Sequence, residues 1–160
     1  MSITRQSSDR LAKRLAAVAP EIKAKLVPAL VKSAEEVADK ARALAEASRR
    51  TDETIESITV TPPGGTTPAY AQGRQSTRAH ELQALVTVGS PEVRTGHLVE
   101  FGTGERHHAD GTPTGKMEAQ PFMLPSWRLS KARVERRINR AINAGVKAAV
   151  AGGNGGSNDA

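Results

Sequence analysis

The side chains best suited to chemistry lie in the turn-rich stretch "GERHHADGTPTGKMEA". His107, His108 and Asp110 stand close together there, and His97 and Glu100 come a few residues earlier. Imidazole nitrogens and carboxylate oxygens are ligands that zinc and similar ions take in proteins. Adjacent histidines in a glycine-rich segment nevertheless match none of the spaced ligand patterns of metal sites. The sequence therefore favours a solvated polar loop over a metal site.

No arrangement in the sequence would activate a nucleophile. Serine and threonine are plentiful, but there is no G-x-S-x-G elbow, and "TPPGGTTP" lacks the Gly-Lys-Ser/Thr ending of a phosphate-binding loop. The chain has no cysteine, which excludes disulfides, thiolate metal sites and cysteine nucleophiles. We therefore expect a protein that is not an enzyme and that holds no metal or cofactor.

Basic residues crowd the segment that follows Trp127, where they could meet phosphate groups. They are Arg128, Lys131, Arg133, Arg136, Arg137 and Arg140. On a helix they would form one or two positive faces, and such faces make salt-sensitive contacts with nucleic acid without reading its bases. No known DNA-binding motif accompanies them. A solvated face, or one paired with the acidic segment of a neighbouring subunit, is favoured, and nucleic acid is the alternative.

Charge is distributed unevenly along the chain, whose net charge is +6. Residues 1–50 carry 11 Lys/Arg and 6 Asp/Glu, residues 51–126 carry 5 and 9, and residues 127–160 carry 7 and 2. Basic ends that flank an acidic middle suit contacts between subunits or with a polyanion. Only 2% of the residues are aromatic, so the core must consist of small aliphatic side chains, and we expect partner subunits to add stability.

Helical periodicity marks residues 8–49, where apolar residues recur at spacings of three and four. Pro20 and Pro28 remove backbone donors and crowd the preceding turn, so we expect a break or bend before each. Ser33 and Glu36 have the spacing of a capping box, which predicts that a helix begins again there. The result would be a long, kinked N-terminal helical region.

A second helix is predicted over residues 126–150, with Ser126 as its N-cap, and the glycine-rich residues 151–160 have the composition of a flexible tail. In "QPFMLPSW", which precedes this helix, two prolines disfavour helical backbone in the residues before them. Phe122 and Leu124 are therefore expected to alternate against a sheet, with Trp127 in the first helical turn.

Residues 55–125 have the alternating pattern of short strands joined by long loops. The candidates are "TIESITVT", "ELQALVTVGS" and "RTGHLVEFGT". The Pro- and Gly-rich residues 61–81 between the first two predict a protruding loop or a hairpin extension. The element order indicates one α+β domain over residues 1–150, with a small antiparallel sheet of three or four strands and the basic C-terminal helix packed on it.

No segment approaches the roughly 18 to 20 apolar residues of a membrane span, and the N-terminal stretch lacks the apolar core of a signal peptide. We therefore expect a soluble protein that is made in the cytoplasm and has no membrane partner.

Two short motifs, in a fixed order, resemble a family of phage structural proteins. The residues of "VEFGT" are Val99, Glu100, Phe101, Gly102 and Thr103, and those of the second motif include Gln120, Pro121, Phe122, Pro125 and Trp127. The first motif, a variable loop, and the second motif opening a basic helix together resemble the small neck or tail-completion proteins of long-tailed phages. That group includes the minor tail protein Z of lambda.

The resemblance implies a virion protein at the neck or tail end of a siphovirus, assembled in the host cytoplasm. Copies of the chain would form a ring, expected to be hexameric, around the DNA channel. The ring would complete the tail and join it to the head, touching the tail tube or tail terminator protein, the head-side connector or stopper proteins, and the channel DNA by non-specific contact. A tail terminator ring that caps tube growth is one alternative, and a basic non-specific nucleic-acid-binding protein is another.

Overall fold

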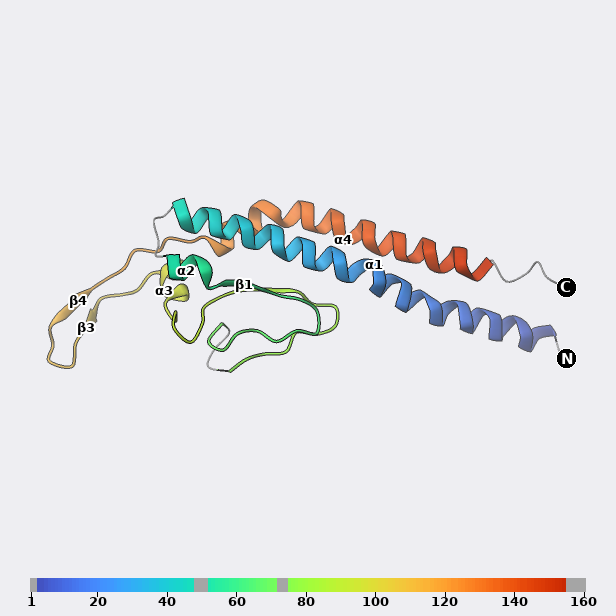
Figure 1. The fold of residues 1–160 in the computed structure, drawn as a ribbon, viewed down its shortest axis with the longest axis horizontal. Helices are drawn as coiled ribbons and strands as arrows, with labels where there is room; N and C mark the ends of the chain where they lie inside the picture. Colours follow the sequence, from blue (N-terminus) through green and yellow to red (C-terminus); the bar gives the residue numbers. More distant parts are fainter. Residues whose placement is uncertain (1–2, 48–51, 72–74, 155–160) are drawn as a thin grey trace.

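The computed structural model describes residues 3–47, 52–71 and 75–154. Two long helices, α1 (Ile3–Ala47) and α4 (Met123–Asn154), lie side by side, and the smaller elements gather beside one end of this pair (Figure 1). The helices are antiparallel, since α4 contacts earlier parts of α1 as it proceeds. The predicted α+β class is confirmed, with the C-terminal helix packed against the rest of the fold.

Helix α1 is continuous through Pro20 and Pro28. A break at either proline is therefore excluded, whereas the predicted bends before Pro20 and Pro28 stay predictions. The predicted helix start at Ser33 is wrong, because Ser33 lies within the same helix. Both proline side chains are exposed, so the carbonyl groups that lose a backbone partner can be hydrated. The opposite side of α1 packs along α4, and this packing stabilises the continuous helix.

A glycine allows the two long helices to approach closely. On α4, a Cβ atom added to Gly145 would lie 2.5 Å from the Cα atom of Ile22, well inside van der Waals contact. Main chain thus packs on main chain at this crossing, and only glycine fits.

Replacing Gly145 by alanine is expected to destabilise the protein by about 1–3 kcal/mol, the usual cost of overpacking. In an open helix the same change favours folding by about 1 kcal/mol, because alanine has the higher helix propensity. Gly152, also on α4, has nothing within 4 Å of its added Cβ and is the matched control. Urea unfolding of the two variants should give opposite signs, and equal effects would show that the helices do not approach this closely.

A two-stranded antiparallel sheet lies beside α1. It consists of β1 (Ile58–Thr61) and β2 (Leu85–Val88), paired from Ile58 with Val88 to Thr61 with Leu85. The first two predicted strands are therefore confirmed in part. The first is shorter than its pattern, because α2 (Asp52–Glu56) forms a helical turn just before it.

The third predicted strand is wrong, because α3 (Gly96–Phe101) is a helix. Gly96 lies against β2, where an added Cβ would come within 2.8 Å of a Val88 methyl group. The chain therefore crosses β2 instead of pairing with it. Helical geometry then buries the consecutive residues Val99 and Glu100, which a strand would point to opposite faces. This sheet accordingly has two strands, not three or four.

The segment between β1 and β2 is a hairpin extension, as predicted. Backbone N–H groups of Gly64, Thr67 and Ala79 donate across it to the carbonyls of His80, Thr77 and Gly65, with distances of 2.8–3.2 Å. The predicted loop after α3 contains a second small hairpin, formed by β3 (Arg106–His107) and β4 (Pro113–Gly115), which extends away from the helices (Figure 1).

The core lies where α1, β1, α3 and the start of α4 meet. Its buried members are three alanines of α1 with Ile58, Val99 and Phe122. Phe122 is the largest fully buried side chain, so it supplies much of the apolar area of a core that is otherwise small. Among the described residues, no helix has the length and apolar character needed to cross a bilayer.

Candidate functional site

The two sequence motifs meet at the beginning of α4. The carboxylate of Glu100 accepts hydrogen bonds from the backbone N–H groups of Phe122 (2.8 Å), Met123 (2.9 Å) and Leu124 (2.9 Å). The first N–H groups of a helix have no partner within the helix and carry its positive dipole end. Glu100 is only 5% exposed, so a buried carboxylate from α3 serves as the N-terminal cap of α4.

Backbone contacts extend this connection, which we call the motif joint and define as Val99–Thr103 with Met117–Trp127. The carbonyl of Val99 accepts from the N–H of Gln120 at 2.8 Å. Thr103 makes two bonds with Met117, one from its N–H (2.9 Å) and one to its hydroxyl oxygen (3.0 Å). The motif joint is therefore held by backbone groups of both motifs as well as by Glu100.

Gly102 is required by the geometry of the motif joint. Its φ is +71°, a left-handed conformation that favours glycine. An added Cβ would also lie 2.8 Å from the nitrogen of Ala119 and from the oxygen of Met117. Both the backbone conformation and the close approach explain why glycine ends the first motif.

The predicted role of Ser126 as N-cap is wrong. Helix α4 begins at Met123, and the buried Ser126 hydroxyl donates to the Met123 carbonyl at 2.7 Å. Leu124 was expected to pack against the sheet, but its side chain is 45% exposed. Pro125 lies in the first helical turn, where its missing N–H costs nothing, and Glu100 caps the preceding residues.

The motif joint presents two of the four aromatic side chains to solvent. Phe122 faces inward and is fully buried, as predicted, whereas Phe101 is 69% exposed and Trp127 is 43% exposed. Trp127 also borders an apolar groove of ≈ 390 Å³ between α1, α4 and β2. Its walls are formed by Leu30, Ser33, Ala34, Val37, Ala84, Val86, Met123, Leu124, Val134 and Ile138. The second motif therefore contributes to both the core and an accessible apolar surface.

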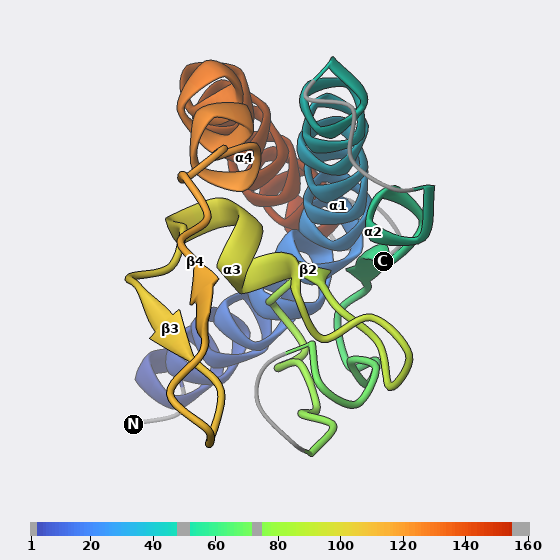
Figure 2. The same cartoon turned by 90° about the vertical axis from the view of Figure 1, so that its left-hand side faces the viewer.

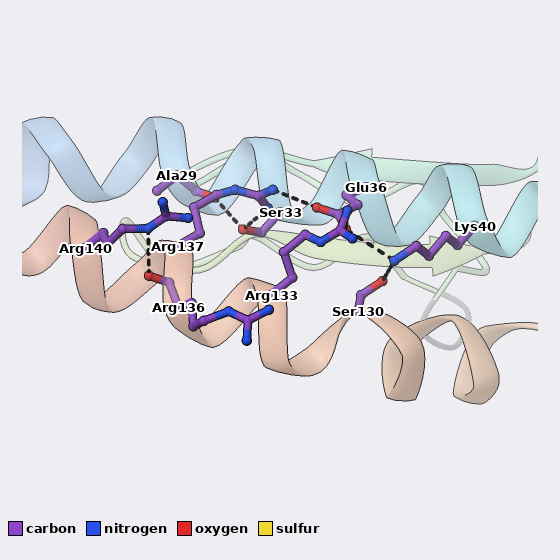
Figure 3. A network of polar contacts seen from close by, with 9 residues as sticks. All are labelled: Ala29, Ser33, Glu36, Lys40, Ser130, Arg133, Arg136, Arg137 and Arg140. Atoms are coloured by element: carbon purple, nitrogen blue, oxygen red, sulfur yellow. Dashed lines mark hydrogen bonds and ion pairs between the residues drawn. The ribbon is translucent and has the colours of Figure 1, made fainter.

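One acidic residue of α1 binds part of the predicted basic surface (Figure 3). The carboxylate of Glu36 accepts from Arg137 at 2.7 Å, and ion pairs join it to Arg133 and Lys40, both at 3.2 Å. Arg137 also donates to the Ser33 hydroxyl at 2.9 Å and is 18% exposed. This cluster attaches α4 to α1, so Arg137 contributes to the fold and is not available to a partner.

The Arg137 hydrogen bond, with further help from Lys40 and Arg133, lowers the pKa of Glu36 below its ordinary value near 4.5. A carboxyl group with a depressed pKa in the folded state stabilises the fold above its ordinary pKa. That stabilisation is lost as pH falls through the folded value. Glu36 is 17% exposed, so solvent weakens these contacts only in part.

Replacing Glu36 by glutamine is therefore expected to cost about 2 kcal/mol at pH 7, the usual contribution of a hydrogen bond to a charged group. The cost should shrink at low pH, because the wild-type carboxyl group becomes protonated as pH falls through its lowered pKa. Denaturant unfolding of both proteins at pH 7 and at low pH tests this. Glu35→Gln, at the exposed neighbouring position, is the control and should change little at either pH. A cost for Glu36→Gln that does not depend on pH would contradict the account.

The remaining predicted basic residues of α4 point outward. Arg128, Arg136 and Arg140 are exposed, and no acidic side chain pairs with them in the part of the chain that the structure describes. The Arg140 Nε atom donates to the Arg136 carbonyl at 3.3 Å, along its own helix. Lys131 makes a long contact with Glu135 at 3.9 Å. A positive surface thus exists, but it is smaller than the sequence indicated.

The histidine-rich stretch forms the exposed end of the β3–β4 hairpin. His107 and His108 are exposed, and Asp110 accepts a hydrogen bond from the Thr112 N–H at 2.9 Å, which lowers its pKa. Within the described ranges, no three histidine and acidic side chains are placed to hold a metal ion. His97 is exposed on α3, and Glu100 binds the start of α4. Asp110 therefore stabilises a hairpin turn, and Glu100 caps a helix.

Comparison with protein families gives a match over residues 9–102 to the HK97-gp10-like family, described as tail components of the bacteriophage HK97-gp10 type. The chain belongs to this family. The match spans more than half of the chain and covers most of α1, the β1–β2 sheet and α3 of this HK97-gp10-like protein, ending within the first motif at Gly102. Searches of curated proteins and of solved structures gave no match.

Membership of the HK97-gp10-like family assigns the chain to phage tail structural proteins, which are part of the virion and interact with other virion proteins. Proteins of this kind are typically not enzymes.

Proposed function

We propose that this HK97-gp10-like protein is a neck or tail-completion protein similar to the minor tail protein Z of lambda. Copies form a ring around the DNA channel of a siphovirus, complete the end of the tail, and join it to the filled head. Its neighbours are the tail tube or tail terminator protein on one side and head-side connector or stopper proteins on the other. The observation that carries this proposal is the family match over residues 9–102.

The surface of the protein supports a role in assembly. A chain with only 2% aromatic residues exposes Phe101 and Trp127, and Trp127 borders an open apolar groove. Aromatic side chains that are partly exposed beside a groove are typical anchors of protein interfaces. The motif joint fixes the positions of Phe101 at the end of α3 and of Trp127 near the start of α4, where both can meet a neighbouring virion protein.

Deleting the gene from its phage distinguishes the proposed role from the tail terminator alternative. Loss of a completion protein should give filled heads and tails of normal length that do not join. Loss of a terminator should give overlong tails, because nothing would stop the growth of the tube. Electron microscopy of lysates, with the gene restored in trans as the control, shows the difference. Joined, infectious particles without the protein would contradict both roles.

Contact with channel DNA is a second component of the proposal, and it is supported by the exposed Arg128 and Lys131 near the start of α4. Binding through such residues depends on phosphate charge, so affinity for duplex DNA should fall steeply with salt. Titration of short duplexes at several salt concentrations measures this. Tight, salt-sensitive binding by a chain that never associates with itself or with tail proteins would favour the nucleic-acid-binding alternative.

A further inference from the structure

Helix α4 carries a row of cations on its outer side. Arg133, Arg136, Arg140 and Lys147 follow at spacings of three, four and seven, which places them on one face and spreads them over about 21 Å at ~1.5 Å per residue. We call this row the basic stripe. All four residues are exposed, and only Arg133 has an acidic partner, Glu36, among the described residues. The basic stripe is therefore largely uncompensated by the part of the chain that the structure describes.

The chain also has an acidic surface that forms no ion pair with the cations of the described residues. Glu53 and Glu56 of α2 and Glu92 of the loop after β2 border a hollow of ≈ 470 Å³, which we call the acidic hollow. In the described part of the chain no lysine or arginine forms an ion pair with these carboxylates, and Glu92 accepts only the Ser90 hydroxyl, at 2.9 Å. Like charges gathered on one surface favour a basic partner.

These two surfaces cannot meet within one molecule. Helix α1 lies between α4, which carries the basic stripe, and α2, which borders the acidic hollow (Figure 2). Complementary surfaces on different parts of the molecule are what a head-to-tail contact between identical subunits needs. When such a contact is repeated with a rotation that closes, it generates a ring.

We propose that the basic stripe of one copy docks in the acidic hollow of the next copy. This inference rests on the proposed ring and names its subunit contact. A second copy satisfies both surfaces at once, whereas DNA would satisfy only the basic stripe and would be repelled by the acidic hollow. The contact also uses the uneven charge of the sequence, in which an acidic middle lies between basic ends.

Two charge-reversed variants test the contact. Glu53→Lys/Glu56→Lys makes the acidic hollow basic, and Arg136→Glu/Arg140→Glu makes the basic stripe acidic. All four positions are exposed, and circular dichroism should confirm that both variants fold. In sedimentation experiments with the full chain, each variant alone should self-associate about tenfold or more weakly than the wild type, because like charges then face each other.

An equimolar mixture of the two variants should restore association, because each then offers the surface that the other needs. High salt should weaken the wild-type and mixed assemblies alike. Glu105→Lys with Glu118→Lys, at exposed positions away from both surfaces, is the control and should not affect association.

The inference is overturned if the mixture fails to associate, if the wild type stays monomeric, or if neither reversal has an effect. It is also overturned if only the Arg136→Glu/Arg140→Glu variant is affected and duplex DNA binding is lost with it, since the basic stripe would then face DNA. Complementation of the gene deletion separates this from the proposed function. Variants that do not associate as predicted but still join heads to tails leave the joining role intact.

Discussion

Replacing Glu100 by alanine is expected to lower the free energy of unfolding by about 3 kcal/mol. Loss of a helix cap usually costs about 0.5–2 kcal/mol of stability, and loss of a hydrogen bond to a charged group costs about 1.5–3 kcal/mol. The change removes the acceptor for the N–H groups of Phe122, Met123 and Leu124, at 2.8–2.9 Å. These groups lie at the buried start of α4, where water cannot replace the carboxylate fully. The start of α4 should then fray, and the connection to α3 should loosen.

Denaturant unfolding with two matched variants tests this expectation. Glu118→Ala removes the same charge from an exposed position within the motif joint and should have little effect on stability. Glu100→Gln keeps an oxygen acceptor but loses the charge, so its cost should be intermediate. If Glu100→Ala and Glu118→Ala are equally stable, then Glu100 does not cap α4.

Replacing Phe122 by alanine is expected to cost about 4 kcal/mol, within the range for large aromatic residues in a core. Phe122 is fully buried. The other buried residues of the core are three alanines, one isoleucine and one valine. The surrounding side chains would collapse only in part into the cavity that truncation would leave. The variant should unfold at a much lower temperature and enter fewer particles.

His108→Ala is the control for this truncation, because His108 is exposed at the β3–β4 hairpin. Substitutions at such exposed positions usually change stability by less than about 0.5 kcal/mol. Thermal melting and incorporation into particles should therefore be close to wild type. Similar behaviour of Phe122→Ala and His108→Ala would contradict the assignment of the core.

Much of the fold followed from periodicity. The apolar spacing at both ends of the chain predicted α1 and α4, and the alternation around Ile58 and Val86 predicted β1 and β2. These patterns are informative because each element buries one side against the others. Proline was the weaker signal: Pro20 and Pro28 stay within α1, since tertiary packing along α4 and exposure of the proline side chains outweigh the local preference for a break.

The local sequence pattern predicted a strand where the structure has the helix α3. The residues from Leu98 to Phe101 have the apolar character of a strand, but Gly96 packs on β2 and Glu100 must reach the start of α4. Both requirements come from residues distant in sequence, so no local window could reveal them. The same holds for the cap of α4, where a neighbouring serine was expected and a glutamate 22 residues earlier serves instead.

The sequence predicted which residues belong to the candidate site but not how they are arranged in space. The two motifs were identified as a pair, and the structure brings them into contact through Glu100, Val99 and Gly102. The basic residues of α4 were treated as one set, yet Glu36 binds Arg137 and leaves Arg136 and Arg140 exposed. Which arginine meets α1 depends on the rotation of one helix against the other, and sequence spacing alone does not define that rotation.

A cryo-EM reconstruction of the neck and tail end of the virion tests the central claim most directly. The account predicts copies of the α1–α4 pair in a ring around the DNA channel, between the tail tube and the head-side proteins. Adjacent copies should place the basic stripe of α4 against the acidic hollow beside α2. A neck and tail end fully accounted for by other proteins, with no density for this helix pair, would contradict the account.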